Sequence, residues 1–347
     1  EFRRVLFRST VHKLASNENP LGPSPKAVQA ASECLSHLEL YPDASAEALR
    51  DGIGKHWGIE SGRIVIGDGS DELLRLLASM FISSGDEAIM ADLTFGVYSH
   101  AVNLMGGTPV RVPLKDFKHD LDTMLSLCSD KTKMVFICNP NNPSGTYLTK
   151  PELTRFIEQL PKHIVVVLDE AYYEFVTHPG RADGLDYIRS GHNVVVLRTF
   201  SKAYGLAGLR VGYAMTTPEY AAMLNTVRAP FNVNTVAQVA GLAALDDHAH
   251  LAATVSNNTT ERAKLVTNLQ SLGCTVVPSE ANFVLTNVHV DSRELYPRLL
   301  RHGVVVRPGY EFGLLTYLRI SVGTKEQMSA CFSALQQELL ALGKLDS

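Results

Sequence analysis

Two charged residues follow apolar runs that read as buried strands. Lys202 comes after the run at residues 194–199, and Asp169 comes directly after the run at residues 164–168. Neither lysine nor aspartate is often buried without a partner. A lysine in such a place commonly acts as an amine nucleophile toward a carbonyl group. Asp169 should face a cation, which is either a protonated ring nitrogen of a ligand or a structural arginine.

Two further loops offer hydrogen-bond donors. Residues 67–71, Gly-Asp-Gly-Ser-Asp, lie between an expected strand and an expected helix. Glycines let the backbone approach an anion and a helix N-terminus presents free N–H groups, so this loop predicts a phosphate cradle. The alternative is a tight turn in which Ser70 or Asp71 caps the helix. Asn142, in the loop at residues 139–145, could donate its amide to an oxyanion, although this loop could also be a simple turn.

The four loops together point to one ligand. Pyridoxal phosphate needs a lysine for its aldehyde, a carboxylate for its ring nitrogen, donors for its phenolate oxygen and a cradle for its phosphate. Lys202, Asp169, Asn142 and residues 67–71 supply these groups, each after an expected strand. Ligands of open α/β sheets bind outside the carboxyl ends of the strands, so we expect the loops to meet there. Residues 67–71 lack the Gly-x-Gly-x-x-Gly pattern that would favour a nicotinamide cofactor.

Short strands alternate with helices through most of the chain. Strands are expected at residues 63–66, 87–90, 133–138, 164–168, 194–199 and 209–214, and helices at 71–81 and 95–105. Strands rich in Val and Ile between helices are typical of a mostly parallel sheet buried on both faces. Beyond residue 250, short strands are expected at 274–278, 281–286, 304–307 and 318–322, with helices at 292–302 and 325–342. The sequence therefore predicts an α/β fold, with a large domain at 26–250 and a smaller α+β C-terminal domain at 251–347.

Composition excludes several classes of protein. The chain has 347 residues and a net charge of −4, which gives no basic surplus for binding nucleic acid. Its apolar runs are too short to span a membrane. The five cysteines are widely spaced and form no Cys-x-x-Cys pair, which argues against disulfides and zinc and favours a reduced, cytoplasmic protein. The twelve histidines predict no metal site, and the nearest candidate, residues 246–250, is expected to be a solvated helix end.

A series of motifs gives the chain a family resemblance over residues 13–345. The motifs are SNENPLG at 16–22, YPD at 41–43, GDGSDE at 67–72, NPNNPSG at 139–145, DEAY at 169–172, RTFSK at 198–202 with LAGLR at 206–210, and RISVG at 319–323. The chain resembles class II pyridoxal-phosphate aminotransferases of fold type I, and within them it is most similar to the histidinol-phosphate aminotransferase family. The resemblance implies a mostly parallel seven-stranded sheet in the large domain.

The resemblance also implies a role for each matching position. Lys202 would hold the cofactor covalently and later move the proton, and Asp169 would pair with the pyridine nitrogen. The other implied cofactor contacts are Asn142 and Tyr172 on the phenolate oxygen, Phe95 on the ring face, Gly69, Ser70, Asp71, Ser201 and Arg210 around the phosphate, and Tyr41 reaching the phosphate in the partner subunit. The implied substrate-binding residues are Asn17, Asn19, Asn142, Arg307 and Arg319. Arg319 would bind a carboxylate, and Arg307 would add charge for a substrate phosphate.

The implied activity is transfer of an amino group between L-histidinol phosphate and 2-oxoglutarate, in histidine biosynthesis, by a homodimer that shares Tyr41 across its interface. An aromatic amino-acid aminotransferase shares nearly every motif and stays an alternative. A pyridoxal-phosphate lyase, such as a threonine-phosphate decarboxylase, is a further alternative, although residues 17–20 favour the transferase. A regulatory sensor is disfavoured because no helix-turn-helix is seen ahead of this region.

The chain departs from the family pattern at two places. Leu93 stands where the family usually has proline, just before the predicted stacking ring of Phe95. Residues 1–25 are expected to hold a substrate-covering segment preceded by a non-native leader at 1–9, so the N-terminal arm of the family is expected to be truncated. Because that arm normally packs on the partner subunit, its truncation would weaken the dimer.

Overall fold

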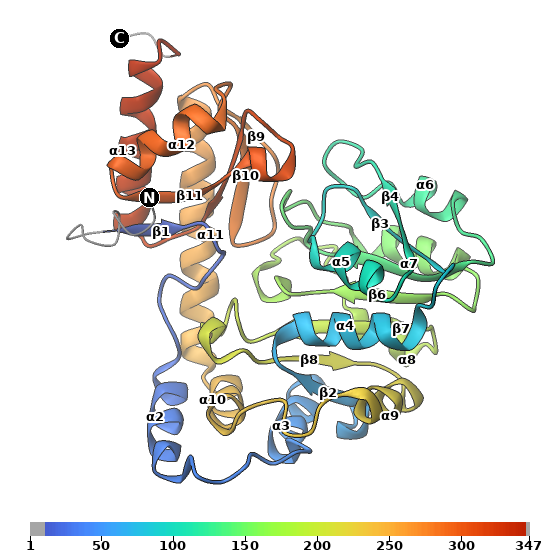
Figure 1. Ribbon diagram of the computed structural model, residues 1–347. Helices are drawn as coiled ribbons and strands as arrows, with labels where there is room; N and C mark the ends of the chain where they lie inside the picture. Colours follow the sequence, from blue (N-terminus) through green and yellow to red (C-terminus); the bar gives the residue numbers. More distant parts are fainter. Residues whose placement is uncertain (1–10, 345–347) are drawn as a thin grey trace.

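The computed structural model describes residues 11–344, so the predicted leader at residues 1–9 lies outside the described residues. Two sheets, each covered by helices, are connected by the long helix α11 (His248–Ser271). Figure 1 shows the small sheet at the upper left, the large sheet with its helices to the right and below, and α11 running between the two regions. Within residues 11–344, no helix is long and apolar enough to cross a membrane.

The large sheet has seven strands and confirms the predicted α/β architecture. Their order is β2 (Ile64–Gly67), β8 (Gly212–Met215), β7 (Val194–Thr199), β6 (Val165–Asp169), β5 (Thr132–Cys138), β3 (Glu87–Ala91) and β4 (Thr108–Val112). Strand β8 pairs antiparallel with both β2 and β7, and the other pairs in this sheet are parallel. The sequence analysis did not predict β4, an edge strand whose proline and arginine break the apolar pattern.

Both faces of the large sheet are buried, because successive side chains of a strand point to opposite faces. On β6, Val165 and Val167 belong to the core beneath α4 (Gly69–Phe81), α5 (Val97–Leu104) and α9 (Pro218–Val227). Val166 and Leu168 belong to the core on the other face. That face is covered by α2 (Pro25–Cys34), α3 (Glu47–Trp57), α6 (Leu121–Ser126), α7 (Lys150–Gln159), α8 (Gly184–Arg189) and α10 (Thr235–Leu245). Each fully buried aliphatic side chain contributes about 1.5–3 kcal/mol, which fixes these strands rigidly.

The small sheet combines the two ends of the chain. Its order is β1 (His12–Leu14), β11 (Val304–Pro308), β12 (Tyr317–Ser321), β10 (Phe283–Asn287) and β9 (Thr275–Val276). It packs on α11, α12 (Ser292–Arg301) and α13 (Lys325–Ala341). Strand β1, which the sequence analysis did not predict, pairs in parallel with β11 and buries Leu14 in the core of this sheet. The segment after β1 then passes from the small sheet toward the large one.

Short 3-10 turns complete the elements of the described chain. They are η1 (Leu35–His37), η2 (Ser61–Arg63), η3 (Tyr173–Phe175), η4 (Ala207–Leu209) and η5 (Gly309–Phe312). Three of them lie close to the predicted site residues: η3 follows Tyr172, η4 precedes Arg210, and η5 follows Arg307. All five cysteines are free thiols.

Candidate active site

A cavity of about 710 Å³ lies at the carboxyl ends of the large-sheet strands. Its walls come from both sheets and from residues 15–17, which we call the strap. Of the residues predicted from the sequence, twelve line this cavity: Asn17, Ser70, Asp71, Phe95, Asn142, Asp169, Tyr172, Ser201, Lys202, Arg210, Arg307 and Arg319. Residues spread over most of the chain therefore meet at one place, because the parallel strands end at the same edge of the sheet.

Lys202 projects into the cavity from the loop after β7. Its Nζ donates a 3.1 Å hydrogen bond to the backbone carbonyl of Ser16 in the strap. The surrounding protein withdraws water from this amine and the Arg319 guanidinium repels its charge, so the pKa of Lys202 falls to about 8. About a tenth of the amine is therefore unprotonated and nucleophilic at pH 7, far more than for an ordinary lysine.

Asp169, at the end of β6, is buried, and among residues 11–344 no cationic side chain donates a hydrogen bond to it. Burial raises its pKa to about 6, although hydrogen bonds from Tyr98 and from the Ala171 backbone oppose this shift. The Tyr98 hydroxyl donates to Oδ2 at 2.7 Å, and the Ala171 N–H donates to Oδ1 at 3.1 Å. A structural arginine, the alternative weighed from the sequence, does not occupy this position. The carboxylate is instead held ready for a cation that enters through the cavity.

Tyr98 is a site residue that the sequence analysis missed. It lies on α5, three residues after Phe95, and is completely buried. Burial raises the pKa of its hydroxyl well above the ordinary value, so Tyr98 stays neutral and donates to Asp169. The available signal was its position three residues after Phe95 in the helix predicted at 95–105. In the structure α5 begins only at Val97, and the Phe95 and Tyr98 rings make an edge contact with centroids 5.7 Å apart.

A hydrogen-bond network joins the strap, the large sheet and the small sheet. Asn17 Nδ2 donates to the Tyr172 hydroxyl at 3.0 Å, and Arg319 Nη1 donates to Asn142 Oδ1 at 2.5 Å. Arg319 Nη2 donates to the Ala15 carbonyl at 2.7 Å. Since the Asn142 oxygen is occupied by Arg319, its amide group is free to donate toward a ligand oxygen. The Tyr172 hydroxyl accepts from Asn17 and is likewise left with a proton to donate.

The predicted phosphate cradle lies at the N-terminus of α4. Gly69 has a φ of +71°, and any Cβ at this position would collide with the guanidinium of Arg210. A Cβ at Gly212 would meet the backbone nitrogen of Ser70. Arg210 Nη2 lies 3.7 Å from Asp71 Oδ2, and the Ser201 hydroxyl lines the same part of the cavity. Glycines, a helix N-terminus and an arginine thus form a compact anion site.

Two arginines on inner strands of the small sheet close the opposite wall. Arg307 on β11 and Arg319 on β12 are directly paired residues of antiparallel strands. Arg319 is 7% exposed and its Nε has no hydrogen-bond partner. Burial, with repulsion from Arg307, lowers the pKa of Arg319 to about 10, although Tyr172 and Glu311 oppose the shift. Arg307 forms a 2.7 Å ion pair with Glu311.

The structure does not bring every predicted residue into the cavity. Asn19 lies outside it, where its Nδ2 donates to the Ala203 carbonyl and to the Thr254 hydroxyl. Its role is to fix the chain that follows the strap, since its amide is fully engaged there. Tyr41 is also outside: its side chain is 82% exposed and stacks on Phe231 with ring centroids 4.7 Å apart. Tyr41 thus has no contact with the cavity of its own chain.

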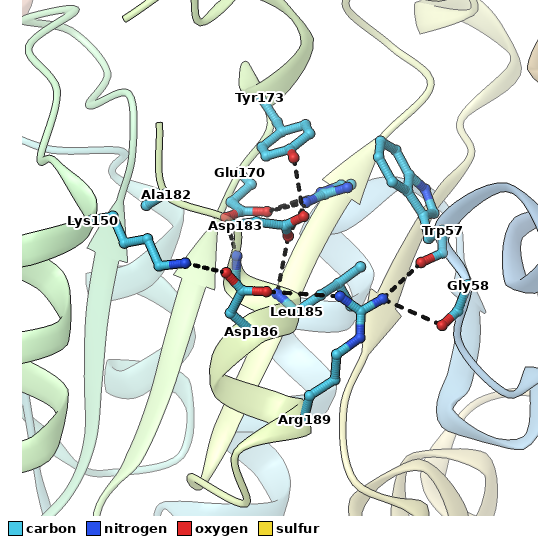
Figure 2. Close-up of polar contacts among 12 residues, drawn as sticks. Trp57, Gly58, Lys150, Glu170, Tyr173, Ala182, Asp183, Leu185, Asp186 and Arg189 are labelled. Atoms are coloured by element: carbon cyan, nitrogen blue, oxygen red, sulfur yellow. Dashed lines mark hydrogen bonds and ion pairs between the residues drawn. The ribbon is translucent and has the colours of Figure 1, made fainter. Parts of the chain in front are cut away.

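A buried ionic network supports the strand ends from the opposite side of the sheet. Glu170, the neighbour of Asp169, accepts from Arg198 Nε and Nη2 at 2.9 and 2.7 Å, and Arg198 Nη2 also donates to Asp183 at 2.9 Å. Figure 2 shows Glu170 and Asp183 close to Tyr173, and it shows Asp186 between Lys150 and Arg189. The Arg198 guanidinium lies 4.0 Å from the centroid of the Trp57 ring. Because Arg198 is on β7 and Glu170 follows β6, the network ties together the two strands that carry Lys202 and Asp169.

The cavity fits pyridoxal phosphate on grounds of chemistry. It holds a nucleophilic amine, a buried carboxylate without a cation, free amide and hydroxyl donors, and an anion cradle that a Cβ would fill. These groups match the aldehyde, the ring nitrogen, the phenolate oxygen and the phosphate of the cofactor. Phe95 lines the same wall, where an aromatic ring could pack against the ligand ring.

Comparisons with known proteins place the chain in a family. The family of class I and II aminotransferases matches residues 9–335. The chain is 46% identical, over 98% of its length, to a histidinol-phosphate aminotransferase of Moorella thermoacetica, of which it covers 88%. It is also 46% identical, over 96% of its length, to one from Anaeromyxobacter, of which it covers 93%. The crystal structure of a histidinol-phosphate aminotransferase from Sinorhizobium meliloti, in complex with pyridoxal-5'-phosphate, superposes with a TM-score of 0.91 at 28% identity, over 96% of this chain and 92% of that one. The family predicted from the motifs is therefore confirmed, and the chain belongs to the class I and II aminotransferases.

Proposed function

We propose that this aminotransferase uses pyridoxal phosphate to transfer the amino group of L-histidinol phosphate to 2-oxoglutarate. The observation that carries the proposal is the arrangement of Lys202, Asp169 and the two arginines around one cavity. The relatives named histidinol-phosphate aminotransferase support the choice of donor, since they are 46% identical over nearly the whole chain. The expected products are imidazole acetol phosphate and glutamate.

Lys202 is the residue that attaches the cofactor and moves the proton. Pyridoxal phosphate supplies an electrophilic aldehyde and a ring that accepts electrons from the substrate carbon. The lowered pKa of Lys202, about 8, makes its amine a good nucleophile at neutral pH and later a base of suitable strength. Its hydrogen bond to Ser16 holds Nζ on the strap side of the cavity, where a substrate would enter.

Asp169 keeps a proton on the pyridine nitrogen. A buried carboxylate with a raised pKa gains most from a cationic partner, so a protonated ring nitrogen is the group that it would bind best. Tyr98 and the Ala171 N–H fix the carboxylate in one orientation. Asp169 would thereby keep the ring of a bound cofactor positive, which favours negative charge developing on the substrate carbon.

Arg319 and Arg307 select anionic substrates. Histidinol phosphate carries a phosphate dianion, whereas glutamate and 2-oxoglutarate each carry two carboxylates, and one cavity must accept all of them. A planar guanidinium binds carboxylate and phosphate with two parallel hydrogen bonds. Arg319 uses one N–H of each Nη on Asn142 and Ala15, and the second N–H of each Nη remains for a ligand. Arg307 adds a second positive charge directly opposite.

The active unit is a homodimer in which Tyr41 completes the partner's site. Tyr41 is exposed and stacks on the exposed ring of Phe231, and the chain segment before it exposes Val28, Leu35, Leu38 and Leu40. A monomer would leave these apolar side chains in water, and exposed apolar surface of this kind favours an interface. The neighbouring backbone is well anchored, because Gln238 donates to the Asp43 carbonyl and Asp43 caps Glu47. The Tyr41 hydroxyl would add a donor to the cofactor phosphate of the partner.

An activity panel tests the proposed function. The protein, loaded with pyridoxal phosphate, is assayed with histidinol phosphate and with phenylalanine, each with 2-oxoglutarate as acceptor. We expect kcat/KM to be at least about tenfold higher for histidinol phosphate, since a lost charged contact in a pocket costs about 2–5 kcal/mol. A preference for phenylalanine would assign the aromatic aminotransferase activity instead. Release of carbon dioxide from threonine phosphate would assign the lyase.

A further inference from the structure

The two arginines of the cavity, Arg307 and Arg319, lie side by side on neighbouring strands. Arg307 and Arg319 are register partners, and side chains of such a pair lie on the same face of the sheet. Like charges placed opposite each other repel, which is part of the reason why the pKa of Arg319 is lowered. Among the described residues, Arg319 bonds only to neutral acceptors, Asn142 and Ala15. The pair therefore needs an anion from elsewhere.

Glu311 supplies this anion. It lies on η5, four residues after Arg307, and its Oε2 is 2.7 Å from Arg307 Nη2. The turn that carries Glu311 is fixed: a Cβ at Gly309 would collide with the carbonyl oxygens of Leu314 and Tyr317, and the Leu314 N–H donates to the Gly309 carbonyl at 2.9 Å. Both Glu311 and Arg307 also line the cavity, so the ion pair lies within it.

The charges of this cluster do not suit a bound dianion while the ion pair is closed. Two guanidinium groups and one carboxylate carry a net charge of +1, whereas the arginines alone carry +2. A ligand anion beside the closed pair would meet the Glu311 carboxylate as well as the arginines, and like charges repel. The side chains of Arg307 and Glu311 are 46% and 34% exposed, so the pair can open at little cost.

We propose that Glu311 is a specificity-determining residue, an internal counter-ion that occupies Arg307 until the anionic group of a substrate displaces it. The inference rests on the proposed function, in which Arg307 binds a substrate anion. A phosphate or a distal carboxylate competes directly with Glu311 for the guanidinium. A donor such as phenylalanine has no second anion, leaves the pair closed and gains nothing from Arg307. Glu311 thus sets how strongly an anion must bind before Arg307 contributes.

The experiment measures binding of inorganic phosphate to the cofactor-loaded protein by calorimetry. Wild type is compared with Glu311→Gln, Arg307→Ala and the double variant Arg307→Ala/Glu311→Gln. We expect Glu311→Gln to lower the Kd for phosphate about three- to fivefold, because it removes a competing surface ion pair. Arg307→Ala should raise the Kd, and Glu311→Gln should then have no further effect. The matched control is Glu294→Gln, which removes another Arg–Glu pair spaced by four residues, on α12 and outside the cavity.

Steady-state kinetics supply the second readout. Glu311→Gln should lower KM for histidinol phosphate and for 2-oxoglutarate by a similar factor and leave KM for phenylalanine within about twofold. The proposal is overturned if Glu311→Gln raises the Kd for phosphate or leaves it unchanged. It is also overturned if neither the wild type nor Glu311→Gln binds phosphate detectably, or if Glu311→Gln still lowers the Kd on the Arg307→Ala background. Phosphate binding does not depend on which donor is turned over. Tighter phosphate binding without turnover of histidinol phosphate would therefore contradict the proposed function and not the role of Glu311.

Discussion

Tyr98 donates a 2.7 Å hydrogen bond to the Asp169 carboxylate from α5, and both side chains are buried. Burial penalises the charged form of Asp169, whereas the Tyr98 hydroxyl and the Ala171 N–H stabilise it. Burial has the larger effect, since the pKa of Asp169 is about 6 and the ordinary value is 3.8. Without a ligand cation, this carboxylate is therefore a destabilising feature of the fold, as expected where a site is prepared for a charged ligand.

The first prediction concerns the stability of the cofactor-free protein. Well below pH 4 the Asp169 carboxyl is protonated in both the folded and the unfolded chain. As the pH rises from 4 to 6 the unfolded chain loses its proton first, so folding loses stability, by up to about 3 kcal/mol above pH 6. Asp169→Asn avoids this penalty and should be more stable than wild type at pH 7–8 but equal to it below pH 4. Urea unfolding across this pH range checks the result.

The same variant has the opposite effect on activity, which serves as its control. With cofactor bound, Asp169→Asn should lose about 10²- to 10⁴-fold in turnover, because it cannot hold the ring proton. A variant that is no more stable than wild type at pH 8 would show that Asp169 has a partner other than Tyr98 and Ala171 in the free protein. Near-native turnover would place the charge partner of the ring elsewhere.

The second prediction concerns Lys202. The protein should be yellow when loaded with cofactor, and Lys202→Ala should bind the cofactor without a covalent bond. Attachment to the cofactor-free protein should become faster between pH 6 and pH 8, as the amine of Lys202, with a pKa of about 8, loses its proton. Borohydride reduction followed by peptide mapping locates the label, with Lys26→Ala as a control on an exposed lysine. Label on a lysine other than Lys202 would contradict the assignment.

The third prediction separates the two arginines. Arg307→Ala should lower kcat/KM for histidinol phosphate much more than for phenylalanine, since only the phosphate ester needs a strong anion site there. Arg319→Ala should damage both donors, because each presents an anion to this residue, and loss of a buried charged contact costs about 2–5 kcal/mol. Steady-state kinetics of both variants on both donors provide the comparison. Equal losses for the two donors in Arg307→Ala would remove the reason to prefer the phosphate ester.

The fourth prediction concerns the dimer. Mixing Tyr41→Phe subunits with Lys202→Ala subunits should restore activity, because the hybrid holds one site with both an intact Lys202 and an intact Tyr41 from the partner. Neither parent protein contains such a site. The measurement is activity as a function of the mixing ratio after the subunits have exchanged. If Tyr41 acts within its own subunit, the hybrid contains no complete site. The activity of every mixture then does not exceed the sum of the two parent activities.

Much of the large domain could be predicted from the sequence, because its signals are local. Apolar runs followed by a charged residue mark both a buried strand and the loop at its carboxyl end: Asp169 comes directly after such a run, and Lys202 comes three residues after Thr199. Strand β7 (Val194–Thr199) has the predicted bounds, whereas the strand predicted at 209–214 begins only at Gly212 as β8, after the 3-10 turn η4 has ended at Leu209. The left-handed conformation of Arg210, with a φ of +56°, separates the two, and no local pattern announces it.

Other parts of the site depend on contacts that side-chain patterns do not encode. The carbonyls of Ala15 and Ser16 bind Arg319 and Lys202, but a backbone acceptor carries no residue-specific signal. Strand β1 has three residues, too few for a periodicity, and exists because β11 offers an edge. Asn19 and Asn17 share one asparagine-rich segment, yet only Asn17 reaches the cavity, since the chain between them turns.

Strand β1 and the strap have a practical consequence for handling the protein. The carbonyls that hold Lys202 and Arg319 follow directly after a three-residue strand, whose ladder with β11 is the nearest anchor. An affinity tag or a protease cut just ahead of His12 would therefore disturb the positions of the Ala15 and Ser16 carbonyls in the active site. This holds although His12 is far in sequence from the cofactor-binding loops. A tag at the carboxyl end would instead follow α13, none of whose residues lines the cavity. Preparations that differ only in tag position should differ in substrate affinity, and the carboxyl-terminal tag is the one suited to kinetic work.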